Sequence, residues 1–163
     1  MHIIYKNKNI FCGNLKAKCA FGKKGVGFKK REGDLITPIG IYKINQLFYR
    51  KDRVKNLYSK IKKKIIRKNM GWCNDPKNKK YYNKLIKIKK KIKHEILYRK
   101  DFKYDFIIPI KYNTKNIKLK KGSAIFIHLT KNYTKTLGCV ALKKNDFLIL
   151  LRLINKKTKI KII

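Results

Sequence analysis

The residue best suited to nucleophilic chemistry is a cysteine preceded by a glycine. Cys139 follows Gly138 at the end of a polar loop and precedes an apolar segment. A turn with glycine beside the nucleophile lets backbone N–H groups converge on a developing oxyanion. His128 ends an apolar run, with ten residues between it and Cys139, and the loop between them can bring its imidazole to the thiol. The pattern predicts a Cys/His pair for covalent catalysis, with a core cysteine and an unrelated histidine as the alternative.

Positive charge near the thiol bears on its reactivity. Lys131, Lys135 and Lys143 flank Cys139 in the sequence. Because cations and a neighbouring imidazole favour the thiolate, we expect the pKa of the Cys139 thiol to be lowered.

The other cysteines form weaker patterns. Cys12, Cys19 and Cys73 show no C-x-x-C spacing with one another or with Cys139, so we expect no metal site. Cys12 and Cys19 suit a buried core, whereas pairing of all four cysteines into two disulfides stays open for an oxidising compartment.

The charge balance is extreme. Lys and Arg number 46, Asp and Glu only 8, and the net charge is +38. Lys, Ile, Asn and Tyr, which share A/T-rich codons, dominate the composition, so we interpret the charge as compositional bias. A polyanion-binding function is the alternative, for nucleic acid, an anionic membrane or a wall polymer. Since the chain is poor in Arg and its lysines are dispersed, we expect no specific nucleic-acid partner.

The few acidic residues are clustered. Six of the eight lie in the segments 30–34, 71–76 and 94–105. We expect internal ion pairs with Arg31 or Arg99, or a polar site.

Four motifs occur in order along the chain. They are Lys-Arg-Glu-Gly-Asp at 30–34 with Thr37, Pro38 and Gly40; Gly-Trp-Cys-Asn-Asp-Pro at 71–76 with Tyr82 and Asn83; His94-Glu95 with Asp101, Tyr104 and Asp105; and Gly-Ser-Ala-Ile-Phe-Ile-His at 122–128 followed by Thr-Leu-Gly-Cys-Val-Ala-Leu at 136–142. Together they resemble the catalytic core of the L,D-transpeptidases of the YkuD family, in a compact, stand-alone form.

The resemblance implies a role for individual residues. Cys139 corresponds to the nucleophile, and His128 to the general base, oriented by a main-chain carbonyl. The N–H groups of Gly138 and Cys139 correspond to the oxyanion hole, and Thr136 stands where the family has Ser or Thr.

Other positions are assigned to the substrate groove or depart from the family. Leu137 replaces a histidine, and Ala141 replaces an arginine, which affects substrate recognition more than the nucleophilic chemistry. We expect groove-supporting residues at Arg31, Glu32, Asp34, Trp72 and Asp75.

The family also implies a reaction. Cys139 would attack the carbonyl of the third residue of a peptidoglycan stem peptide, and an amine would resolve the thioester. With water as acceptor the same site would be an L,D-carboxypeptidase or a cross-link hydrolase, and a Lys-rich polyanion-binding protein is the non-enzymatic alternative. No metal or organic cofactor is implied, and we expect a monomer. The cell envelope is the implied location, although residues 1–14 lack a signal-peptide pattern and a cytoplasmic location stays open.

Length and periodicity predict the elements that position these residues. A chain of 163 residues favours one domain, 1–163, and no apolar run approaches the roughly 20 residues of a transmembrane helix. Strands are predicted at 1–5, 9–11, 18–21, 104–110, 122–129, 138–142 and 158–163, with a turn and strand at 34–44. A helix is predicted at 146–154, capped by Asn145. Residues 52–69 are ambiguous, and 85–96 are predicted as loop and strand leading to a short helix. The expected fold is mainly β, a YkuD-type β-sandwich with a C-terminal helix and one or two short additional helices.

Overall fold

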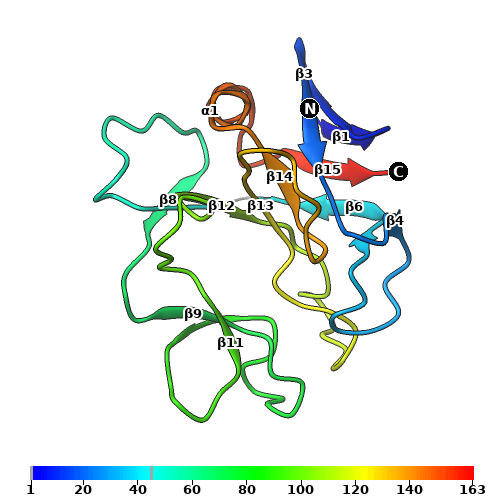
Figure 1. Ribbon diagram of the computed structural model, residues 1–163, viewed down its shortest axis with the longest axis vertical. Helices are drawn as coiled ribbons and strands as arrows, with labels where there is room; N and C mark the ends of the chain where they lie inside the picture. The colour runs from blue at the N-terminus through cyan, green and yellow to red at the C-terminus, as the bar shows by residue number, and fades with distance from the viewer. Residues whose placement is uncertain (1, 45) are drawn as a thin grey trace.

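A computed structural model of the chain describes residues 2–44 and 46–163, which form mainly β structure (Figure 1). In chain order the elements are β1 (His2–Lys6), β2 (Asn9–Cys12), β3 (Leu15–Ala20), β4 (Val26–Gly27), β5 (Thr37–Pro38), β6 (Gly40–Lys43), β7 (Gln46–Tyr49), β8 (Lys62–Ile65), β9 (Met70–Cys73), β10 (Leu85–Lys87), β11 (His94–Ile96), β12 (Phe106–Pro109), β13 (Phe126–Leu129), β14 (Val140–Leu142), α1 (Lys144–Leu153) and β15 (Lys159–Ile162).

Ten of these strands form one mixed, curled sheet. Its order is β6-β15-β1-β2-β3-β14-β13-β12-β7-β8. The pairs β1–β15, β13–β14 and β7–β8 are parallel, and the other neighbours are antiparallel. A separate three-stranded sheet, β10-β9-β11, lies at the lower end of the molecule in Figure 1. The mainly β class with one C-terminal helix is therefore confirmed.

The two halves of the large sheet differ in burial, and their sequences explain why. Side chains alternate in β1 and β15, where Ile3 and Ile160 are buried and the intervening residues are exposed. Such alternation is typical of a sheet with one solvated face. All four residues of β12 and all four of β13 are buried. The near-continuous apolar sequence of these strands thus predicts their central position.

Helix α1 packs against the sheet through one face. Phe147, Leu150 and Leu151 are buried and belong to a hydrophobic cluster with side chains from β1–β3, β12 and β13. The rings of Phe147 and Phe106 stack with centroids 5.3 Å apart. The helix begins two residues earlier than predicted: Lys143 is its N-cap, and the N–H of Phe147 bonds to the Lys143 carbonyl. The predicted Asn145 cap is therefore wrong, because Asn145 lies inside the first turn.

The additional short helices are also not present among the described residues. Segment 85–96 forms β10, a turn and β11, both paired with β9. After Leu85 its apolar residues are all isoleucines, which favour strands, and pairing with β9 outweighs their four-residue spacing. Segment 52–69 forms a loop and then β8. The strand predicted at 1–5 is β1, although Met1 lies outside the described residues. No described helix has the length and apolarity needed to cross a membrane.

We predict that Phe147→Ala lowers the free energy of unfolding by about 3–5 kcal/mol, because it removes a buried ring and leaves a cavity beneath α1. Urea titration of the purified chain measures this change. Ile149→Ala, on the exposed side of the same helix, is the matched control and should change stability by less than ~1 kcal/mol. Equal losses in the two variants would contradict the packing described for α1.

Candidate active site

Pairing of two central strands brings His128 and Cys139 to one face of the sheet. In the parallel β13–β14 pair, His128 lies opposite Ala141. The backbone N–H of Phe126 lies 3.4 Å from Sγ of Cys139, and Phe126 and His128 share a face because they are two residues apart on one strand. Phe126 and Cys139 belong to the same buried cluster. The structure thus places His128 and Cys139 on the same side of the central strands, both beside Phe126.

The imidazole of His128 is held in one tautomer. Its Nδ1 lies 2.9 Å from the carbonyl oxygen of Leu129, which can only accept a hydrogen bond. Nδ1 therefore carries the proton and Nε2 is left with a free lone pair. The edge of the ring contacts Tyr104, with centroids 5.3 Å apart. Burial lowers the pKa of His128 to about 4, so the ring is neutral at neutral pH and can accept a proton.

The thiol of Cys139 is buried and protonated. Cys139 is 9% exposed, and its Sγ lies 3.4 Å from the carbonyl oxygen of Ala124, to which it donates. Burial raises the pKa of the Cys139 thiol to about 12. The expectation of a lowered pKa is wrong, because loss of water disfavours the thiolate more than distant lysines favour it.

The turn before Cys139 is closed by Thr136. Its hydroxyl donates to the carbonyl of Cys139 at 2.6 Å and accepts from the N–H of Gly138 at 3.1 Å. Gly138 has φ +139°, and a Cβ there would stand 3.0 Å from the Ile36 carbonyl, so a larger residue would strain the turn. The Gly138 N–H is thus bonded within the turn, which means that an oxyanion would have to compete with the Thr136 hydroxyl for it.

The same turn is anchored to the connection between β3 and β4. The N–H of Thr136 bonds to the Phe21 carbonyl, and the N–H of Lys23 bonds to the Thr136 carbonyl. Gly22 lies between them, and a Cβ there would stand 2.3 Å from the Leu35 carbonyl. Only glycine therefore permits this close approach of three segments.

A buried amide, Asn83, supports the opposite side of the site. Its Oδ1 accepts from Nε1 of Trp72 at 3.0 Å and from the N–H of Ala124 at 3.1 Å. Its Nδ2 donates to the carbonyls of Tyr112 and Asn113. Ala124 adopts φ +51° and offers its carbonyl to the Cys139 thiol. Asn83 thus holds in place the backbone that contacts the nucleophile, a role that sequence reasoning missed although the motif contained it.

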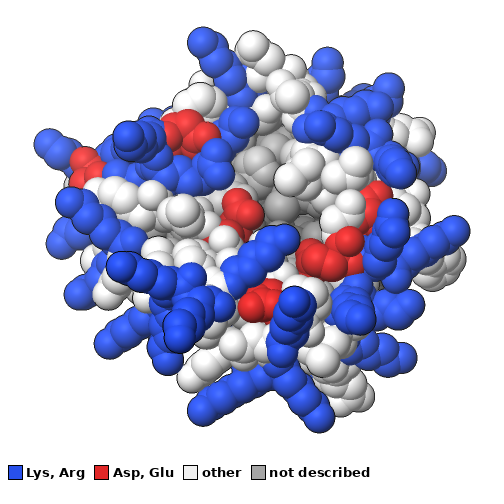
Figure 2. Space-filling view, turned by 60° about the horizontal axis from the view of Figure 1, so that its bottom comes forward, with Lys and Arg blue, Asp and Glu red and all other residues white. Residues whose placement is uncertain are grey.

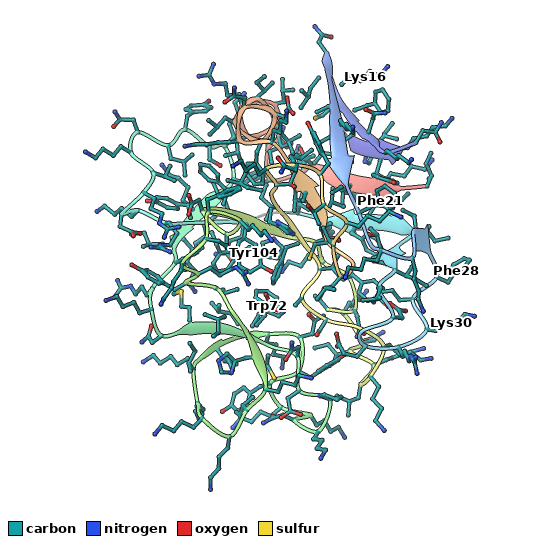
Figure 3. All side chains as sticks on the ribbon, viewed as in Figure 1. Lys16, Phe21, Phe28, Lys30, Trp72 and Tyr104 are labelled. Carbon is teal, nitrogen blue, oxygen red and sulfur yellow. The ribbon has the colours of Figure 1, made fainter. Side chains whose placement is uncertain are left out.

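Trp72 lies between the small sheet and the large one, where Figure 3 shows it near Tyr104. The ring of Phe126 meets Trp72 edge-on at 5.3 Å and Tyr104 edge-on at 6.0 Å. The predicted supporting position of Trp72 is consistent with these contacts.

Glu32 connects the loop 28–34 to the segment before β13. One carboxylate oxygen, Oε2, accepts hydrogen bonds from the hydroxyls of Tyr82 and Ser123. The Tyr82 hydroxyl also accepts from the N–H of Gly122. Glu32 therefore supports the segment that leads to Ala124.

Asp34 has a different partner from the one expected. Its carboxylate pairs with Nζ of Lys29, and both side chains are more than nine-tenths buried. Backbone N–H groups of Lys30, Arg31 and Ile36 also bond to it. The expected ion pair with Arg31 is wrong: its side chain is exposed, and the buried lysine beside it neutralises Asp34.

The third acidic segment folds beside His128. Arg99 pairs with Asp101 at 2.6 Å and with Glu95 at 3.8 Å, as the alternative with Arg99 predicted. Glu95 also accepts from the hydroxyl of Tyr104 at 2.9 Å. No role was predicted for Glu95 or Tyr104. The clustering of acidic residues in segment 94–105 is the sequence feature that points to their position near the site. Figure 2 shows a few acidic side chains among the many Lys and Arg on the face that it presents.

Asp75 stays within its own turn. Its side chain accepts from the N–H of Lys77, and its carbonyl accepts from the N–H of Asn78. These bonds shape the chain after β9 and do not bring the carboxylate to Cys139.

Cys139 is largely withdrawn from solvent. The two best-defined hollows formed by described residues lie at 53–58 with α1 and at the β6–β15 edge, and neither is lined by Cys139 or His128. The four cysteines, all among the described residues, are free and buried. In the same part of the chain no group of three or more His, Cys, Asp or Glu side chains is placed to hold a metal ion.

Comparison with models of known protein families identifies the family of the chain. Residues 2–162 match the L,D-transpeptidase catalytic domain family, YkuD. The chain belongs to the YkuD family. The match covers nearly the whole chain and includes all the motifs described above. A search of curated proteins found no significant match. Membership implies an L,D-transpeptidase enzyme with a peptidoglycan substrate.

We predict that Asn83→Ala destabilises the fold by about 3 kcal/mol, because it leaves buried donors and acceptors around Ala124 without partners. Chemical denaturation measures the loss. Asn145→Ala removes an amide from an exposed position and should change stability by less than ~1 kcal/mol. A similarly small effect of Asn83→Ala would show that the hydrogen bonds of the Asn83 amide are not needed for stability.

The lowered pKa of His128 makes the stability of the fold depend on pH. Its folded-state pKa of about 4 lies below the ordinary value of 6.5, so between these values the unfolded chain binds more protons. Stability contributed by this group should therefore fall as pH decreases from about 6.5 towards 4, by about 3 kcal/mol in total.

The measurement is the free energy of unfolding against pH for the wild type and for His128→Gln. Carboxylate titrations are common to both proteins, so their difference isolates the histidine. Parallel curves would contradict a buried, neutral imidazole.

Proposed function

We propose that the chain is a cysteine-dependent L,D-transpeptidase that forms an acyl-thioester on Cys139 with His128 as general base. The observation that carries this proposal is the position of both groups on one face of the β13–β14 pair, with Nδ1 of His128 bonded to the Leu129 carbonyl. Family membership supports the substrate class, a peptidoglycan stem peptide.

The first half-reaction begins from two neutral groups. Sγ of Cys139 attacks the carbonyl carbon of the third-position diamino acid as its proton moves to Nε2 of His128. The C–N bond to the terminal D-alanine then breaks, and the imidazolium returns the proton to the departing amine. Because burial disfavours a resting thiolate, charge would develop mainly during the attack.

The oxyanion of the tetrahedral intermediate must be stabilised by hydrogen-bond donors. The N–H groups of Cys139 and Gly138 are the candidates, and the Gly138 N–H must exchange the Thr136 hydroxyl for the substrate oxygen. Since a donor aimed at the developing charge strengthens in the transition state, this exchange would favour the transition state over the bound substrate.

The second half-reaction releases the enzyme. An acceptor amine attacks the thioester carbonyl, its proton passes to His128, and the C–S bond breaks with return of that proton to sulfur. Water in place of the amine would make the product a free carboxylate, as in an L,D-carboxypeptidase or cross-link hydrolase.

We further propose that the protein acts in the cell envelope, where its substrate occurs. The alternative of a polyanion-binding protein without chemistry is not favoured, because three hydrogen bonds of its thiol and carbonyl position Cys139.

We predict that Cys139→Ala abolishes formation of the acyl-enzyme and turnover of muropeptides. Mass spectrometry of the intact protein after exposure to a tetrapeptide muropeptide or a carbapenem measures the adduct. The matched control is Cys12→Ala, which removes another buried thiol and should retain the adduct. Adduct formation without Cys139 would refute the covalent mechanism.

We predict that His128→Gln slows acylation by ~10²-fold, because proton transfer from the thiol loses its acceptor. Stopped-time mass spectrometry of the same adduct measures the rate. A wild-type rate would show that the thiol ionises without the imidazole.

A further inference from the structure

In the half of the large sheet formed by β6, β15, β1, β2 and β3, the described side chains of one face are exposed or partly exposed. The strands β6, β15, β1, β2 and β3 turn alternate side chains towards α1 and the core, and the others point outwards. We call these outward residues the outer face; they are Ile41 and Lys43 of β6, Lys159 and Lys161 of β15, His2, Ile4 and Lys6 of β1, Asn9 and Phe11 of β2, and Lys16 and Lys18 of β3.

The lysines of the outer face oppose one another. Lys43 is the direct partner of Lys159 across the β6–β15 pair, and Lys161 follows on the same face. None of the eight acidic residues lies in these five strands, and no ion pair among the described residues includes these lysines. Since like charges opposite one another destabilise a sheet, an anionic partner would relieve this repulsion.

Exposed apolar side chains lie between the lysines. Ile4 is 37% exposed, Ile41 58% and Ile163, directly after β15, 50%. Phe28 is 79% exposed and lines one hollow with Ile41 and Ile163; Figure 3 shows its ring at the outer edge of the molecule. Large side chains exposed together mark an interaction surface rather than ordinary solvent contact.

The combination fits a lipid surface better than a nucleic acid. Interfacial membrane binding combines lysines, attracted to anionic headgroups, with apolar side chains that enter the headgroup region. Nucleic-acid sites rely on arginine forks and exposed aromatic platforms. The outer face has no arginine, and Phe11 is only partly exposed beneath Lys16. Phe28 at its edge offers a single exposed ring rather than a series of stacking platforms.

We propose that the outer face, with Phe28 and Ile163 at its edge, is a docking surface for an anionic lipid bilayer. Phe28 precedes Lys29, whose side chain pairs with Asp34 in the loop that supports the active site. Docking would therefore hold the loop 28–34 beside the membrane.

Vesicle co-sedimentation of the full chain tests the proposal, with phosphatidylglycerol–phosphatidylcholine vesicles compared with pure phosphatidylcholine. The variant Lys43→Gln/Lys159→Gln/Lys161→Gln should weaken binding to the anionic vesicles on the order of 100-fold, roughly fivefold for each lysine. The matched control, Lys87→Gln/Lys90→Gln/Lys91→Gln, removes the same charge from exposed positions of the small sheet. It should weaken binding by less than ~3-fold, since those charges stand away from the docked surface.

The apolar contribution is tested by Phe28→Ser/Ile41→Ser, which should weaken vesicle binding on the order of 10-fold and preserve binding to duplex DNA. Phe102→Ser, an exposed position elsewhere, should leave both unchanged. Equal losses from the two lysine triples would overturn the proposal, because attraction would then follow net charge alone. Unchanged vesicle binding by the Phe28/Ile41 variant would also overturn it and would identify the face as a general polyanion surface.

Discussion

The parallel pairing of β13 with β14 is the constraint on which the rest of the structure depends. It places the face that carries His128 beside the turn that carries Cys139. Both strands lie inside the sheet, between β12 and β3, and every side chain in them is buried. A shift of one residue would exchange the two faces, so the register of this pair sets the position of the imidazole relative to the thiol.

Burial also determines the charge state of the pair. Although the chain carries a net charge of +38, its surface lysines are screened by water. The loss of hydration at the site acts directly on the two reacting groups: it raises the pKa of the thiol and lowers that of the imidazole. Both groups are consequently neutral, and in the proposed mechanism this favours proton transfer during attack over a preformed ion pair. The bonded Leu129 carbonyl leaves the reactive nitrogen available for that transfer.

The scarce polar side chains join segments that apolar packing alone would not hold in place. Asn83 joins Trp72 of the small sheet to Ala124, and Glu32 joins its loop to Tyr82 and Ser123. Each has several partners, so each costs little to bury and would cost much to leave unpaired. The polar connections therefore converge on the backbone around the thiol, whereas the lysines of the outer face have no acidic partner in the structure.

The sequence by itself determined the mainly β class, the C-terminal helix and the family, because apolar periodicity and ordered motifs are local properties. Its assignment of Cys139 and His128 as the reacting pair stays a prediction. Only the tertiary structure decided the partners and the electrostatics. Segment 85–96 forms strands instead of a short helix because β9 supplies its hydrogen bonds. Asp34 pairs with Lys29 instead of Arg31 because the fold buries the lysine and exposes the arginine. The Cys139 pKa rises instead of falling because desolvation depends on everything packed around the thiol, and neighbouring residues in the sequence do not reveal that packing.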